Sequence, residues 1–264
     1  MTCYNQTKPY ERHEGDAAAA RVKCVEEMKR ALDSGKYKRL KKCAKFILRA
    51  FEEVPVDLTP KIRVGIVGEI YVKYSPLGNS HLEDFLLSEG CEPVVPALMD
   101  FILYCVVNNI NDAKFYGLNK KLAVVYKLVY IWLYGKQKKL IRWTKKYSRF
   151  EPFHDFVHLR RCADKVINQG GLIPAEMAAL AETGTGNIVC AQPFGCLPNH
   201  IAGKGAVRAL KNLYPDENIV PVDYDPSATR VNQENRIKLM LATARENMRA
   251  KESGPQDAET SKAS

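Results

Sequence analysis

Short runs of apolar, β-branched residues occur at four places in this chain, and helical patterns separate them. Residues 61–68 (KIRVGIVG) and 92–97 (EPVVPA) are predicted strands, because each is a short apolar run bounded by turn residues. Between them, residues 80–89 (SHLEDFLLSE) have the pattern of a helix that ends at Gly90. This part of the chain predicts one β-α-β unit, followed by a helix at 98–109.

A second β-α-β unit is predicted towards the end of the chain. Its elements are two strands at 187–191 (NIVCA) and 218–223 (NIVPVD), a helix at 200–213 and a long final helix at 229–249. Strands that are separated by helices pair in parallel, and the helices cover the faces of the sheet. The sequence therefore predicts an α/β fold with a parallel, doubly wound sheet.

The rest of the chain has helical patterns and no strand signal. Two helices are predicted in residues 1–55, with a break at Ser34-Gly35, and a basic helical insertion is predicted at about 111–167. Residues 56–250 then form the α/β domain that contains this insertion. Residues 251–264 are polar and lack an apolar stripe, so they are predicted to be a disordered tail.

The composition of the chain indicates a folded protein without a membrane-spanning helix. Of the 264 residues, 46% are hydrophobic and 27% are charged, which excludes a wholly disordered chain. The longest apolar stretch, residues 122–134, is interrupted by Lys127 and is shorter than a membrane helix requires. The first residues have no hydrophobic signal region, so a cytoplasmic protein with reduced thiols is expected.

Positive charge is concentrated in two segments. Residues 36–49 and 136–149 each contain seven Lys or Arg and no acid, whereas the net charge of the whole chain is +10. The simpler interpretation is two solvated helix faces, and the alternatives are surfaces for an acidic partner, a coenzyme's phosphates or nucleic acid. Trp143 and Tyr147 are suited to stacking on bases, but two aromatic rings are weak evidence for nucleic-acid binding. Nucleic acid is therefore not an expected partner.

Two loops follow predicted strands, at the edge of a parallel sheet where ligands bind. They are residues 69–79 and residues 190–200. Cys190 lies near a strand end, and Cys196 precedes a predicted helix with its N-cap at Asn199, a position that favours a thiolate. Thiolates are the ligands of iron–sulfur clusters, but the spacing of these two cysteines matches no standard metal pattern. Two buried thiols remain the simpler alternative at this point.

Other residues near these loops have two interpretations each. Asp223 either caps the final helix or holds a ligand hydroxyl. Glu69 is either a catalytic base or a loop carboxylate paired with Lys73. Lys204 lies between two glycines that allow a helical turn to approach a ligand closely, with His200 one turn earlier. The cysteines in helical or strand contexts are predicted core thiols: Cys24, Cys43, Cys91, Cys105 and Cys162.

The same loops carry a family resemblance. The segments VGIVGEIYVKYSPLGNSHLEDFLLSEGCEPVVPALMDFILY and NIVCAQPFGCLPNHIAGKGAVRALKNLYPDENIVPVDYDPSATRVNQENRIKLML resemble the acyl-CoA dehydratase activase-related proteins. These proteins are relatives of the 2-hydroxyacyl-CoA dehydratase subunits and of the double-cubane cluster proteins. The resemblance covers about residues 7–245 and corresponds to the C-terminal portion of the family's longer members.

The resemblance implies flavodoxin-like or Rossmann-like lobes that hold an iron–sulfur cluster, expected to be [4Fe–4S]. In the dehydratases, an ATP-hydrolysing activator delivers electrons that allow a 2-hydroxyacyl-CoA to lose its hydroxyl group. Carried over to this chain, Cys190 and Cys196 would be the cluster ligands. Glu69, Tyr74 and Asn79 would form the opposite wall of the cleft, with Glu69 and Tyr74 as the catalytic candidates. The candidate substrate-binding residues are Asn79, His200, Lys204 and Asp223.

Two cysteines cannot complete a cubane cluster. A second copy of the chain or a separate cysteine-bearing lobe is therefore expected to supply the other ligands, and the chain would be one half of a split protein. The expected partners are this second lobe, the activator and an acyl-CoA, with no membrane. The alternatives are a cluster-free interaction or scaffold domain of the same fold, or a subunit of a radical dehydratase.

Overall fold

The computed structural model describes residues 1–117, 120–167, 171–225, 227 and 229–253. The chain divides into two compact units. A helical unit contains residues 1–60 and 94–179, and a sheet unit contains residues 61–93 and 180–264. The boundary at residues 179–180 falls within one helix, α9 (Leu172–Glu182).

The sheet unit is built on four strands in the order β2-β1-β3-β4. Their bounds are β1 (Arg63–Gly68), β2 (Glu92–Val94), β3 (Asn187–Pro193) and β4 (Asn218–Tyr224). The pairs β1–β3 and β3–β4 are parallel, in a register that places Gly68 opposite Ala191 and Gln192 opposite Asp223. The predicted α/β fold with a parallel sheet is confirmed.

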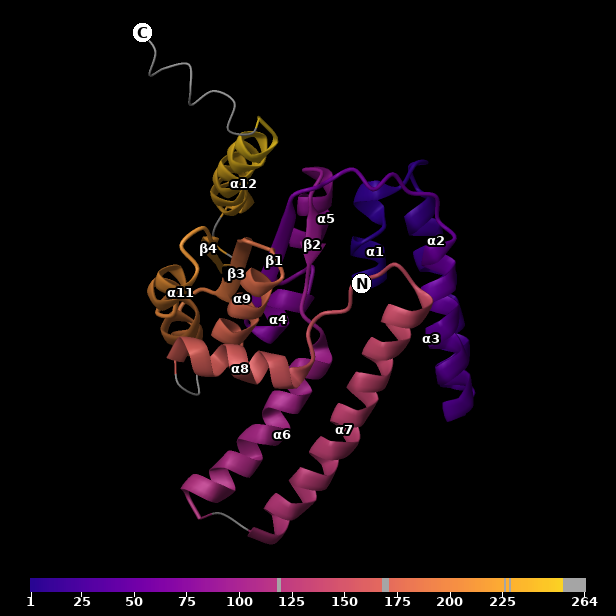
Figure 1. The fold of residues 1–264 in the computed structure, drawn as a ribbon, viewed down its shortest axis with the longest axis vertical. Helices are drawn as coiled ribbons and strands as arrows, with labels where there is room; N and C mark the ends of the chain where they lie inside the picture. Colours follow the sequence, from indigo (N-terminus) through magenta and orange to yellow (C-terminus); the bar gives the residue numbers. More distant parts are fainter. Residues whose placement is uncertain (118–119, 168–170, 226, 228, 254–264) are drawn as a thin grey trace. The chain divides into compact units, whose positions relative to one another are not determined.

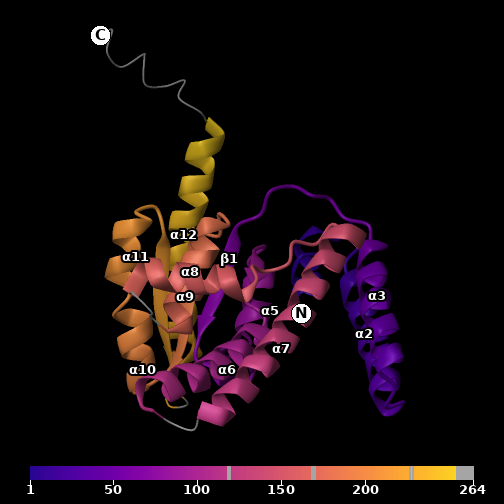
Figure 2. The ribbon, with the colours of Figure 1, turned by 60° about the horizontal axis from the view of Figure 1, so that its bottom comes forward.

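Short helices follow the strands of this unit, and one long helix ends the described chain. They are α4 (Ile70–Tyr74), α5 (Leu82–Ser88), α10 (Leu197–Asn199), a π-helical turn (His200–Lys204), α11 (Val207–Leu213) and α12 (Arg230–Ser253). α12 packs against β4 and β3, as Figures 1 and 2 show, through Ile237, Met240 and Leu241, which are almost fully buried. The predicted tail begins inside this helix, and residues 254–264 lie outside the described part of the chain.

Two local predictions in the sheet unit were wrong. The predicted loop 69–79 contains the helix α4, because the Glu69 carboxylate accepts a hydrogen bond from the Val72 N–H at 2.9 Å and caps it. The predicted single helix at 200–213 is divided into the π-helical turn and α11. At the division, a Cβ on Gly205 would lie 2.3 Å from the Ile201 carbonyl oxygen, so only glycine fits there.

Apart from Val94, the last residue of β2, the described residues of the helical unit form no part of a strand. Its elements are α1 (Thr2–Asn5), the 3₁₀ helix η1 (Lys8–Tyr10), α2 (Asp16–Asp33), α3 (Tyr37–Glu52), α6 (Leu98–Phe115), α7 (Lys120–Tyr147) and α8 (Phe156–Ile167). The break between α2 and α3 falls at Ser34-Gly35, where Gly35 has a φ of +62°. α6 and α7 pack side by side as a long helical pair (Figures 1 and 2).

Four of the five predicted core thiols are buried: Cys24, Cys43, Cys91 and Cys162. The prediction for Cys105 on α6 was wrong, because this thiol is half-buried. The first part of α6 (LMDFILYCVV) is apolar on nearly all sides, so its sequence does not select one buried face. Within the described ranges, no helix combines the length and the apolar character that crossing a membrane requires.

Candidate functional site

The carboxyl ends of β1, β3 and β4 bring segments that are far apart in the sequence to one edge of the sheet. The backbone N–H of Glu69, just after β1, donates a hydrogen bond to the Ala191 carbonyl of β3 at 3.1 Å. The N–H of Phe194, just after β3, donates to the Tyr224 carbonyl of β4 at 3.0 Å. This carboxyl edge is the position at which parallel α/β sheets bind ligands.

Asp223 is the centre of a polar cluster at this edge. The Lys204 ammonium lies 2.9 Å from its Oδ2 atom and 3.2 Å from its Oδ1 atom. The Gln192 amide donates to Oδ1 at 2.5 Å, and the His200 Nε2 atom lies 4.0 Å from the same oxygen. The structure therefore brings together three of the residues that the sequence nominated for substrate binding.

Gln192 is the member of the cluster that sequence reasoning missed. Its side chain is fully buried, and its Oε1 atom has no hydrogen-bond partner among the described residues. A buried amide oxygen without a partner is costly in a protein interior. The signal in the sequence was a single amide within the otherwise apolar strand NIVCAQP.

The Asp223 carboxylate is stabilised in its charged form. Burial by itself raises the pKa of Asp223, but hydrogen bonds from Lys204 and Gln192 and the positive charge of Lys204 outweigh it and lower the pKa below its usual value. A group whose pKa is lower in the folded chain than in the unfolded chain adds stability at pH values above its unfolded pKa. That stability is lost as the pH falls through the folded pKa.

We therefore expect Asp223→Asn to lower the free energy of unfolding at pH 7. The difference from the unmodified protein should shrink as the pH falls from 3.8, the ordinary aspartate value, through the lower folded pKa, because the carboxylate takes up a proton more readily in the unfolded chain than in the folded one. Urea unfolding at a series of pH values measures this difference. Asp33→Asn, at an exposed position, is the control, and an equal pH dependence in both variants would contradict the prediction.

The two candidate cluster ligands occupy different environments. Cys190 lies inside β3, between Val189 and Ala191, and all three side chains are fully buried. Cys196 is half-buried at the residue that precedes α10, and its sulfur accepts a hydrogen bond from the Asn199 amide at 3.3 Å. Neither cysteine belongs to a group of three or more potential metal ligands within the described part of the chain. Cys196 is thus the thiol that this edge of the sheet presents to a ligand.

This difference predicts the order in which thiols react. At pH 8, limited iodoacetamide should modify Cys196 well before Cys190 or Cys91, because alkylation requires an accessible thiolate. Burial, the largest effect, raises the pKa of Cys91 to about 11, although the nearby Arg245 lowers it slightly. Peptide mapping by mass spectrometry measures the order, and the unfolded chain, in which the three thiols should react alike, is the control.

The candidates after β1 are largely engaged in local structure. The Glu69 carboxylate caps α4, and the Asn79 side chain, which is buried, bonds to the backbone on both sides of it. Tyr74 is half-buried, and the ammonium of the buried Lys73 lies 4.9 Å from the centre of its ring. The structure gives Glu69 and Asn79 positioning roles in the turn that follows β1.

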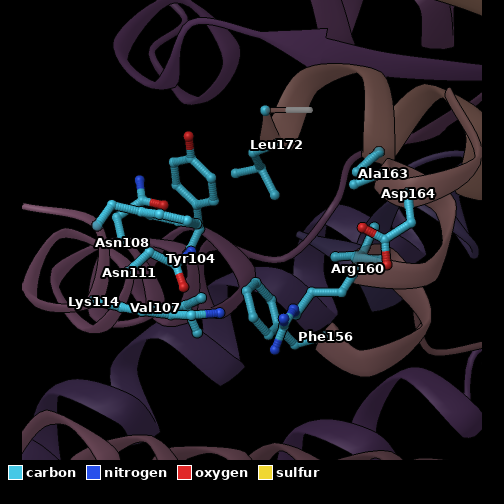
Figure 3. Close-up of a pocket in the computed structure, with 14 residues that line it drawn as sticks. Tyr104, Val107, Asn108, Asn111, Lys114, Phe156, Arg160, Ala163, Asp164 and Leu172 are labelled. Atoms are coloured by element: carbon cyan, nitrogen blue, oxygen red, sulfur yellow. The ribbon is translucent and has the colours of Figure 1, made fainter. Parts of the chain in front are cut away.

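A second feature that the sequence did not indicate is a cavity of about 210 Å³ in the helical unit (Figure 3). α6 lines one side of it with Tyr104, Asn108, Asn111 and Lys114, whereas α8 contributes Phe156, Arg160 and Asp164. The three uncharged polar residues of α6 recur at intervals of four and three residues, which places them on one face of the helix. This spacing was a signal for a polar face directed at another element.

No protein-family model, curated protein or solved structure matches this chain. The chemistry of the carboxyl edge, together with the sequence resemblance, is therefore the basis for a function.

Proposed function

We propose that this protein is an iron–sulfur electron-transfer component of the 2-hydroxyacyl-CoA dehydratase and activase type. The observation that carries the proposal is the half-buried Cys196 thiol at the carboxyl edge, one helical turn before His200 and two turns before Lys204. An accessible thiol beside a cluster of charged side chains suits a redox group that acts on a polar substrate. The resemblance of the loops supplies the substrate class and an ATP-hydrolysing activator as the electron donor.

The donor set allows a test of whether a cluster fits. Cys196 fits, because its sulfur is reachable and receives an N–H donor, and such hydrogen bonds tune cluster ligands. Cys190 does not fit, because strand residues enclose it fully. Each chain would then contribute only Cys196, so that two copies supply two thiolates and a separate cysteine-bearing chain would have to supply the other two. A bound cluster would supply one-electron transfer.

The neighbouring residues suit the binding of an oxygen-rich substrate. Lys204 directs hydrogen bonds to both oxygens of Asp223, and an ammonium group has three donors, so one remains for a ligand oxygen. Gln192 is fully buried, so it contributes to the site through its amide, which donates a hydrogen bond to Asp223 and fixes the carboxylate. Asp223 holds the Lys204 and Gln192 side chains in place, so its role is to position them.

The test is to determine iron and acid-labile sulfide in protein that is purified anaerobically. A [4Fe–4S] cluster shared by two identical chains predicts about two irons and two sulfides per chain. The same ratio should hold after reconstitution with ferrous iron and sulfide. Folded protein that remains free of iron after reconstitution would contradict the proposal for this chain by itself, and addition of the second lobe would then have to restore it.

The second candidate is a cluster-free binding or scaffold domain of the same fold. The complete burial of Cys190 favours it, because the chain then presents one reachable thiol at this edge in place of the two that the resemblance implies. In this case the cluster around Asp223 would bind its ligand without redox chemistry. Iron-free protein with an unchanged circular dichroism spectrum is the result that this candidate predicts.

A further inference from the structure

The two basic segments of the sequence come together in the helical unit. α3 packs beside the C-terminal part of α7, and lysines alternate with aromatic rings where the two helices meet. We name this surface the basic-aromatic seam. It consists of Tyr37, Lys41 and Lys45 on α3 and of Trp132, Lys136, Lys139, Trp143 and Tyr147 on α7.

Contacts between ammonium groups and rings define the seam at both ends. The Lys136 ammonium donates to the Tyr37 hydroxyl at 3.0 Å and lies 5.4 Å from the centre of the Trp132 ring. Further along, the Lys45 ammonium lies 5.7 Å from the Trp143 ring and 5.6 Å from the Tyr147 ring. Because residue 37 meets residue 136 and residue 45 meets residue 147, the two helices run in the same direction along the seam.

The spacing on α7 makes the seam one continuous stripe. Its members on this helix recur at intervals of three or four residues, which places them on one face. At a rise of 1.5 Å per residue, the stripe from Trp132 to Tyr147 is about 22 Å long. A ligand that fits it must therefore be extended and must repeat both a negative charge and an apolar surface.

The positive charge of the seam and its flanks is not neutralised within the described part of the chain. Of the fourteen Lys and Arg in residues 36–49 and 136–149, only Arg149 has a carboxylate of a described residue within ion-pair distance, that of Glu52. Like charges at helical spacing repel one another. A polyanion removes this repulsion and releases its own counterions on binding.

The aromatic rings of the seam are available to a ligand. Tyr37, Trp132 and Tyr147 are 63%, 61% and 50% exposed, which is unusual for side chains of this size. Trp143 is half-buried and has the ammonium groups of Lys41 and Lys139 within 5.4 Å of its ring. Rings that alternate with cations along a stripe match the pattern of surfaces that bind single-stranded nucleic acid.

We propose that the basic-aromatic seam binds single-stranded nucleic acid, with phosphates at the lysines and bases stacked on the exposed rings. An acidic protein is the less suitable occupant, because protein interfaces concentrate their aromatic residues in a desolvated centre with a polar rim. The seam instead repeats cation and ring along its whole length. Its lysines neutralise phosphate without reading base edges, so binding should not depend on sequence. This inference does not depend on the proposed iron–sulfur function.

Fluorescence offers a direct probe of stacking, because both tryptophans of the chain, Trp132 and Trp143, lie in the seam. Titration of the full chain with oligothymidylate should quench their emission. Anisotropy of a fluorescein-labelled oligothymidylate should report an affinity that falls about 300-fold between about 50 and 200 mM salt, if six phosphates are contacted. No change in either signal at the lowest salt concentration would overturn the proposal.

Two sets of variants separate phosphate contacts from stacking. Lys41→Gln, Lys45→Gln and Lys139→Gln together should reduce the slope of log affinity against log salt by about 2. Trp132→Ala with Tyr147→Ala, both at exposed positions, should leave the slope unchanged and weaken binding at least about fivefold for each ring. The matched control, Lys23→Gln, Lys127→Gln and Lys211→Gln, removes the same charge at exposed positions outside the seam.

The outcomes of these measurements decide between ligand classes. The proposal requires the control to bind nearly as tightly as the unmodified protein while both seam variants are impaired. Equal impairment in the control would show a general effect of charge and would overturn it. Polyglutamate and anionic phospholipid vesicles are the competing ligands. The proposal would also be overturned if either binds as tightly as the oligonucleotide and its affinity is unchanged by Trp132→Ala with Tyr147→Ala.

Discussion

Replacement of Gly68 by alanine should destabilise the sheet unit by on the order of 4 kcal/mol. Gly68 ends β1 with a φ of +136°, and a Cβ there would lie 1.7 Å from the Ala191 carbonyl oxygen of β3. That oxygen also accepts the hydrogen bond from the Glu69 N–H. Alanine is therefore strained at this φ, and its methyl group would clash with a strand that is held in place by pairing. Neither the backbone at residue 68 nor β3 can move without a cost in free energy.

The matched control for this change is Gly90→Ala. Gly90 has a positive φ of +75°, but nothing lies within 4 Å of the position of its missing Cβ. This variant should cost only about 1–2 kcal/mol, the penalty of the left-handed conformation. Urea unfolding followed by far-UV circular dichroism measures both. If the two variants unfold at the same midpoint, the close contact between β1 and β3 is contradicted.

Replacement of Asn79 by alanine should lower the free energy of unfolding by about 2–3 kcal/mol, although it removes little apolar surface from the core. The Asn79 amide donates to the Val72 carbonyl at 2.8 Å, and its Oδ1 atom accepts from the Leu82 N–H at 3.1 Å. Ser80 and His81 between these contacts both have positive φ angles, 53° and 60°. The Asn79 hydrogen bonds hold this strained turn in place.

The Asn79 prediction is tested by the same unfolding measurement. Asn235→Ala, at an exposed position of α12, is the control, and it should change the free energy of unfolding by less than about 0.5 kcal/mol. If Asn79→Ala changes the free energy of unfolding as little as Asn235→Ala does, the role of the Asn79 hydrogen bonds in the turn is contradicted. That result would mean that the buried backbone groups of Val72 and Leu82 find other partners when the amide is absent.

The strands were predictable because each is short, apolar and bounded by turn residues. Their parallel pairing followed from the helices between them, and the structure has both features. The helix α4 was not predictable by periodicity, because it is short and depends on one carboxylate, that of Glu69, at its N-terminus. The burial of Cys105 was mispredicted, because a helix that is apolar on most sides carries no signal for its buried face.

The site was predictable only in part. The sequence indicated that residues 69–79 and 190–200 would lie at one edge of the sheet and nominated His200, Lys204 and Asp223 for one site, and the structure places these three together. The sequence could not show that Cys190 is enclosed by the sheet while Cys196 is reachable. The basic-aromatic seam was also hidden, because residues 36–49 and 136–149 are far apart until the helical unit folds.

The most direct test of the central claim compares the iron content of two variants, each of which lacks one cysteine. Cys196→Ala and Cys190→Ala are purified anaerobically beside the unmodified protein, and iron and acid-labile sulfide are determined per chain. The account predicts that Cys190→Ala retains the iron of the unmodified protein and that Cys196→Ala loses it. Retention of iron in Cys196→Ala, or its loss in Cys190→Ala alone, would contradict the role assigned to the reachable thiol.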